Sequence, residues 1–109
     1  MSTGMIAAKY ASALLKFVDE TGGGEALFAQ VRKLDSALDS SGELRRIVDD
    51  PVGVTGQDKI KACEIVLGET MVDELSKFLG LVISHGRLHY LRLMLKSFIE
   101  RYLKSRNIH

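Results

Sequence analysis

Met5–Val18 reads MIAAKYASALLKFV, and this stretch decides the fold because it is too apolar for an ordinary surface helix. Its only polar side chains are Lys9, Ser12 and Lys16, which fall on one narrow stripe of a helix. The other side chains divide into two adjacent apolar faces: Ala7, Ala11, Leu14 and Val18 on one, and Ile6, Tyr10, Ala13 and Phe17 on the other. One face is enough to seat a helix on a small core. The second predicts either deep burial or a surface kept for a partner.

The composition is typical of one globular domain. The chain has 109 residues, of which 46% are hydrophobic, enough to form a single core without disulfides or metals. With 15 basic and 14 acidic residues, the overall charge indicates neither a nucleic-acid nor an acidic partner. Cys63 is the only cysteine, which excludes an internal disulfide and favours a reducing compartment. Neither a membrane-spanning run nor a targeting signal is evident, so we expect a soluble, cytoplasmic domain.

Helical spacing continues along the whole chain and predicts an all-α fold, a compact six-helix bundle forming one domain over residues 1–109. The first helix is expected over about residues 3–19. The next five should turn these side chains inward: Leu27, Val31, Leu34 and Leu38; Leu44, Ile47 and Val48; Ile60, Cys63, Val66 and Leu67; Val72, Leu75, Phe78, Leu79, Val82 and Ile83; Leu88, Leu91, Leu95, Phe98 and Tyr102.

Cap and stop residues set the expected helix boundaries. Three pairs have the spacing of an N-terminal cap and would open the third, fourth and fifth helices: Ser40 with Glu43, Thr55 with Asp58, and Thr70 with Asp73. Four stops separate the helices: Gly22–Gly24, Asp50 with Pro51, Gly68, and Gly86.

Candidate chemical sites are better explained as structural features. Gly22–Gly24 lacks the preceding strand and following lysine that a phosphate loop requires, so it is expected to be a hinge. His85 and His89 have metal-ligand spacing, but the predicted helix stop at Gly86 separates them, and no third ligand is near in the sequence. Asp49 and Asp50 are expected to form a turn rather than a catalytic pair. We therefore predict no catalytic residue, no metal and no cofactor.

The last quarter of the chain allows a different function. Six basic residues there have one acidic neighbour, Glu100, and two tyrosines between them: Arg87, Arg92, Lys96, Arg101, Lys104 and Arg106. Basic residues interleaved with aromatics can follow a nucleic-acid backbone. A small helical RNA-binding regulator of the antitermination type is therefore the alternative function. A solvated outer helix face would give the same pattern.

Several short motifs occur in an order that matches a known family. They are Lys9, Tyr10, Ala11, Ala13 and Leu14; Pro51; Lys59; Phe78 and Leu79; Gly86, Arg87 and Leu88; and the spaced Leu91, Leu95, Phe98 and Tyr102. Together they resemble the N-terminal domain of the ATP synthase delta subunit, called the oligomycin sensitivity-conferring protein in mitochondria. The resemblance covers essentially the whole chain and favours the bacterial form.

That resemblance implies a non-catalytic stator role in the F-type proton-translocating ATP synthase, linking its catalytic head to the peripheral stalk. The expected partner is the N-terminal segment of an alpha subunit, lying against the first and fifth helices. A C-terminal domain, absent here, would bind the b subunits of the stalk, and the chain would end near Asn107 at the linker between the two domains. The protein would be peripheral, at the cytoplasmic face of the bacterial inner membrane, without membrane insertion or nucleic acid.

The partner site is expected between two apolar walls. The first helix would supply Ile6, Tyr10, Ala13 and Phe17, and the fifth would supply Leu75, Phe78, Leu81 and Val82. An amphipathic helix laid in such a groove is a common recognition mode. The alternative is that these side chains simply pack against the sixth helix.

Overall fold

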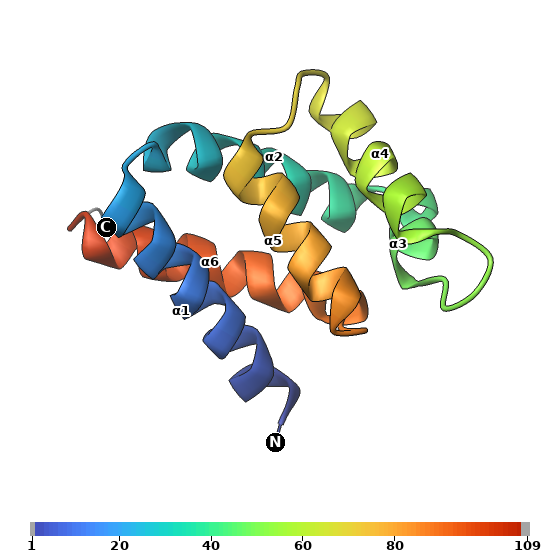
Figure 1. The fold of residues 1–109 in the computed structure, drawn as a ribbon, viewed down its shortest axis with the longest axis horizontal. Coiled ribbons are helices and arrows are strands. Elements are labelled where there is room, and N and C mark those ends of the chain that lie inside the picture. The colour runs from blue at the N-terminus through green and yellow to red at the C-terminus, as the bar shows by residue number, and fades with distance from the viewer. Residues whose placement is uncertain (1, 108–109) are drawn as a thin grey trace.

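The computed structural model describes residues 2–107, and within them the chain forms the six α-helices that the periodicity predicted (Figure 1). It also forms one short 3-10 helix that was not predicted, and this helix contains Leu88, which was assigned to the sixth helix. The elements are α1 (Thr3–Thr21), α2 (Gly24–Ser40), α3 (Gly42–Asp49), α4 (Gly56–Leu67), α5 (Asp73–Ser84), η1 (Leu88–Tyr90) and α6 (Leu91–Ser105). None of the described helices combines the length and the apolar character needed to cross a bilayer.

The first and last helices form the most extensive helix pair of the described residues. α1 packs on α6, and α2 packs on α6 as well (Figure 1). The predicted core face of α1 is buried, as is a matching stripe of α6: Ala7, Ala11, Leu14 and Val18 from α1, and Leu91, Met94, Leu95, Phe98 and Tyr102 from α6. Phe98 has no exposed surface and is the largest fully buried side chain. Burial of this stripe supplies the main hydrophobic stabilisation of α1.

The turn between α1 and α2 requires glycine. Gly22 and Gly23 have φ angles of 79° and 76°, a region that side-chain-bearing residues rarely adopt. Gly24 begins α2 in close contact with α1, because a Cβ atom placed there would lie 2.6 Å from Cγ1 of Val18. The glycine run is therefore the interhelical hinge that the sequence predicted.

Two of the three predicted helix caps are wrong, and the third is confirmed. Ser41, not Ser40, caps α3, and its hydroxyl accepts the Leu44 amide at 3.1 Å. Ser40 remains in the last turn of α2. Thr55 caps α4 as predicted, through the Asp58 amide. Thr70 caps nothing, because α5 begins at Asp73 after Val72, which has no side chain to accept a hydrogen bond.

A buried glutamine takes the place of a cap at the start of α5. Gln30 of α2 accepts the Val72 amide at 2.8 Å and donates to the Thr70 carbonyl at 2.9 Å. Glu64 of α4 accepts the Met71 amide at 2.9 Å. These bonds hold the connection between α4 and α5, and so they fix where α5 enters the bundle.

One inward assignment in α4 is wrong. Cys63 and Leu67 are buried and Ile60 is half-buried, but Val66 is exposed beside Ile65. The helix is short and lies at the periphery, so only a narrow stripe of it faces the core. Burial raises the pKa of the Cys63 thiol to about 11, as expected for a packing cysteine rather than a reactive one.

Replacing Thr55 and Thr70 with alanine, one at a time, should distinguish the residue that caps a helix from the one that does not. Thr55→Ala should lower the free energy of unfolding by about 1 kcal/mol, because the Asp58 amide loses its acceptor. Thr70→Ala should change it by less than about 0.5 kcal/mol, because the exposed side chain caps no helix. Urea unfolding followed by circular dichroism measures both. Equal losses would contradict the assigned start of α5.

Candidate partner-binding groove

An apolar groove of about 190 Å³ lies between α1 and α5. Its lining residues are Tyr10, Ala13, Leu14 and Phe17 of α1, and Glu74, Lys77, Phe78 and Leu81 of α5. We call this surface the α1–α5 groove. Two large apolar side chains in it are well exposed, Phe17 at 40% and Leu81 at 47%. Exposed apolar side chains facing one groove on an otherwise charged surface are typical of a docking site.

The structure brings five of the eight predicted site residues together in this groove. They are Tyr10, Ala13, Phe17, Phe78 and Leu81. Ile6 is half-buried and packs against the core outside the groove. Leu75 and Val82, predicted at the groove floor, are fully buried beneath it. They support the wall but present no surface to a partner.

The groove also has members that the apolar pattern could not indicate. Leu14 was assigned to the core alone, yet its edge reaches the groove lining. Glu74 and Lys77 were missed because they are charged. Their place could have been found from helical spacing, because residues four positions apart share a face: Glu74 lies four positions before Phe78, and Lys77 four positions before Leu81. They give the α5 wall a polar rim around its apolar centre.

Tyr10 closes one end of the groove and is itself buried. Its ring meets the Phe78 ring edge-on, with 6.4 Å between ring centroids. Its hydroxyl lies 2.6 Å from Nδ1 of His85, and Nη1 of Arg87 donates to the same oxygen at 3.2 Å. We call Tyr10, His85 and Arg87 the Tyr10 cluster. It joins the middle of α1 to the C-terminal end of α5.

The end of α5 that carries this cluster is fixed by its backbone. Gly86 has a φ angle of 69°, as predicted for the helix stop. The Arg87 amide donates to the Val82 carbonyl at 3.0 Å and the Gly86 amide to the Ile83 carbonyl at 2.9 Å. This double closure is the usual glycine-terminated helix end. It aims Arg87 back toward α1.

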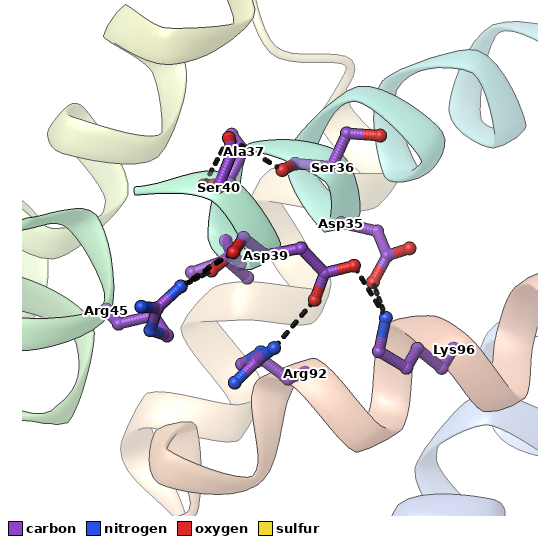
Figure 2. A network of polar contacts seen from close by, with 9 residues as sticks. Asp35, Ser36, Ala37, Asp39, Ser40, Arg45, Arg92 and Lys96 are labelled. Atoms are coloured by element: carbon purple, nitrogen blue, oxygen red, sulfur yellow. Dashed lines mark hydrogen bonds and ion pairs between the residues drawn. The ribbon is translucent and has the colours of Figure 1, made fainter. Parts of the chain in front are cut away.

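The basic residues of the last quarter contact other groups of the domain. Arg92 and Lys96 of α6 reach the carboxylates of α2, with Arg92 2.7 Å from Asp39 and Lys96 3.0 Å from Asp35 (Figure 2). Lys96 also lies 2.9 Å from Asp39, and the hydrogen bonds that Asp39 accepts, first from Arg92 and then from Lys96, hold the pKa of its carboxyl below the usual value. α6 therefore presents paired charges along this side.

Two further basic side chains of that quarter, Arg106 and Lys104, have acidic partners as well, whereas Arg101 donates only to Ser97. Arg106 lies 2.9 Å from Asp19 of α1 and covers the Tyr102 ring at 4.2 Å. Lys104 lies 3.3 Å from Glu100. A side chain that already meets an acidic partner must give up that contact to bind a phosphate. These pairings weaken the case for a nucleic-acid surface on α6.

The residues of the other candidate sites make contacts that support the fold. His85 belongs to the Tyr10 cluster, whereas the His89 ring packs on Tyr90, with 3.9 Å between centroids. Between residues 2 and 107, no three His, Cys, Asp or Glu side chains converge as a metal-ligand set. Asp50 accepts the amides of Val52 and Gly53, and these bonds, that of Gly53 first, lower the pKa of its carboxyl. Asp50 therefore forms the predicted turn.

Comparison with known proteins places the sequence in one family. Residues 6–109 match the family model described as ATP synthase delta (OSCP) subunit. A relative from Phocaeicola vulgatus, named ATP synthase subunit delta, is 34% identical over 109 residues, which cover 99% of this chain and 58% of the relative. Another of that name, from Paramagnetospirillum magneticum, is 36% identical over 104 residues, covering 94% and 56%. No solved structure matches the chain.

The chain therefore belongs to the ATP synthase delta (OSCP) subunit family. The resemblance inferred from the short motifs is thereby confirmed. The chain spans a little over half the length of these two curated relatives, 58% of one and 56% of the other.

Proposed function

We propose that this domain is a non-catalytic stator component of an F-type ATP synthase and that it binds the N-terminal helical segment of an alpha subunit. Membership of the family supports the assignment to the ATP synthase complex, and the α1–α5 groove supports the binding of a helical segment. The observation that carries the proposal is the pair of exposed apolar side chains, Phe17 and Leu81, on opposite walls of one groove.

The chemistry of the groove fits an amphipathic helix. Its centre is apolar, so it can take a row of aliphatic side chains spaced one helical turn apart. Ala13 has a small side chain, which allows the bound helix to come close to α1. Glu74 and Lys77 lie at the rim, where they can meet the polar flank of the helix while staying in contact with water.

The same proposal gives the domain its place in the complex. It would sit peripherally at the cytoplasmic face of the bacterial inner membrane and help to stop the catalytic head from turning with the rotor. Contact with the b subunits of the peripheral stalk would belong to the part of the relatives that this chain does not cover. No step of bond chemistry is assigned to this domain.

A titration with a synthetic peptide tests the proposal. The peptide carries the N-terminal segment of the alpha subunit from the same genome, acetylated and amidated, and binding is followed by calorimetry and by amide NMR shifts. We expect saturable binding, with the largest shifts on α1 and α5. Affinity should change little between 50 and 200 mM salt, because apolar contacts dominate.

A nucleic-acid ligand would behave differently in the same experiment. Neutralising six or more phosphates makes affinity fall by about a thousandfold or more over that salt range. A structured RNA that bound tightly and lost affinity in this way, beside a peptide that did not bind, would overturn the proposal in favour of the RNA-binding alternative.

A further inference from the structure

Arg87 is an exposed cation at the Tyr10 end of the α1–α5 groove, just after the last turn of α5. Four other basic side chains of the last quarter meet carboxylates of the domain: Arg92, Lys96, Lys104 and Arg106. Among the ion pairs of residues 2–107, none includes Arg87. A guanidinium is charged at every physiological pH, so Arg87 is available to an acidic group from outside the domain.

The position of Arg87 is fixed before any partner binds. The Arg87 amide donates to the Val82 carbonyl at 3.0 Å, which holds the backbone at the end of α5. Nη1 of the side chain donates to the Tyr10 hydroxyl oxygen at 3.2 Å, and the guanidinium lies 5.8 Å from the centre of the Tyr10 ring. The Tyr10 side chain is itself buried. Arg87 is therefore held at a fixed point of α1, and a partner that binds it has little left to order.

One edge of this guanidinium is unused. Arginine has five N–H donors in a planar fork, and the side-chain hydrogen bonds of the described residues use only Nη1 of Arg87. Nε and Nη2 form the opposite edge. Two parallel donors on one edge match the two oxygens of a carboxylate, which is the strong bidentate pairing of arginine. The group of a protein partner that fits this edge is an aspartate or glutamate side chain.

The two walls of the groove have no acidic group of their own near Arg87. Residues 2–18 and 75–99 contain no aspartate or glutamate, and they supply every lining residue of the groove except Glu74. α1 and α5 run in roughly opposite directions (Figure 1), so Glu74, in the first turn of α5, lies toward the other end. Lys9 is exposed and precedes Tyr10 in α1, which adds positive charge. A carboxylate of a partner should therefore be attracted to the Tyr10 end.

We infer that Arg87 is the charged anchor of the α1–α5 groove and that the groove selects an amphipathic helix with a carboxylate side chain next to one end of its apolar row. This inference rests on the proposed function, because the helix it describes is the alpha-subunit segment. The groove lining does not choose by charge, since Glu74 and Lys77 have opposite signs. Apolar contacts alone would let such a helix shift by one turn, because its aliphatic side chains repeat with that spacing. An ion pair at one end fixes the register.

A double-mutant cycle tests this ion pair. The alpha-subunit peptide is blocked at both ends, so that its carboxylates come from side chains only, and each acidic residue is replaced in turn by its amide. Arg87→Gln should weaken binding of the unaltered peptide by about fivefold, the upper range for an exposed ion pair. One of the peptide replacements should weaken binding to the unaltered domain equally. The two changes together should cost no more than either alone, because both remove the same contact.

Arg101 provides the matched control. It is exposed on α6, donates to Ser97, has no ion pair among the described residues and does not line the groove. Arg101→Gln removes the same charge in another place, so affinity should stay within about twofold for every peptide. If Arg87→Gln weakens binding of every peptide by the same factor, the role of Arg87 is only to support the groove, and the inference is overturned.

NMR of the unaltered domain gives a measurement that needs no variant of the protein. The Nε–H signal of Arg87 should shift when the peptide binds, and the shift should be lost with the peptide whose coupled acidic residue has been replaced. If the peptide does not bind the unaltered domain at all, the proposed function fails and this inference fails with it. If the peptide binds but no acidic position is coupled to Arg87, the inference alone is overturned.

Discussion

Replacing Leu81 with aspartate should weaken binding of the alpha-subunit peptide by at least about 1 kcal/mol, or about fivefold. Leu81 is 47% exposed on the α5 wall of the groove, so an apolar partner helix would cover it. A carboxylate there would lose water without gaining a hydrogen bond. The free energy of unfolding should change by less than about 0.5 kcal/mol, because the side chain already faces water. Calorimetric titration and urea unfolding measure the two effects.

The chain offers a matched control for this substitution. Leu93 of α6 is 46% exposed and does not line the α1–α5 groove. Leu93→Asp therefore introduces the same charge at the same exposure in another place, and peptide affinity should stay within about twofold. If the two variants weaken binding equally, the effect comes from charge alone and the groove is misplaced. Unfolding of the Leu81 variant would show that Leu81 belongs to the core.

Two phenylalanines should give opposite results when each is replaced by alanine. Phe98→Ala removes a side chain with no exposed surface at the centre of α6, so it should lower the free energy of unfolding by about 3–5 kcal/mol. A domain of this size has about 5–15 kcal/mol of stability, so the variant would be close to unfolding. Phe17→Ala removes a side chain that is 40% exposed, and its loss of stability should stay below about 1 kcal/mol.

Affinity for the peptide should also distinguish Phe17 from Phe98. Phe17 forms part of the α1 wall, so Phe17→Ala should weaken the peptide complex by about 1 kcal/mol or more while the domain stays folded. Thermal unfolding and peptide titration on the two variants give all four values. A large loss of stability in the Phe17 variant, with unchanged affinity, would assign Phe17 to the core and leave the groove without its α1 anchor.

The helical stripes could be predicted from the sequence because burial repeats with the period of the helix. Leu27, Val31, Leu34 and Leu38 are all fully buried, at the spacing that predicted them. The helix boundaries were harder to predict, because two neighbouring residues can both be suitable N-terminal caps. Ser40 and Ser41 are both good caps, and the choice depends on how far α2 continues before its last turn ends. The alternation of apolar and polar residues does not encode that length.

The remaining misses come from contacts between residues far apart in the chain. Gln30 replaces the cap that Thr70 was expected to supply, and it acts across 42 positions to the Val72 amide. Tyr10 lines the groove, but the partner of its hydroxyl, His85, lies 75 positions away and was not predicted. The Tyr10 side chain is buried, so Tyr10→Phe is a cleaner substitution than one that places a charge there. No local pattern indicates either partner, because both depend on how the helices cross.

The packing of α1 on α6 has a consequence for how the chain is made. α1 is synthesised before α6. The core face of α1 therefore has no helix to pack against until nearly the whole domain has emerged from the ribosome. During that interval both apolar faces of α1 are open to other chains, and one of them stays partly open even after folding. Local helix formation is fast, but the packing of α1 on α6 joins segments far apart in the sequence and must wait for the synthesis of α6. We therefore expect the apolar faces of α1 to be most exposed to aggregation or to a chaperone just before α6 emerges.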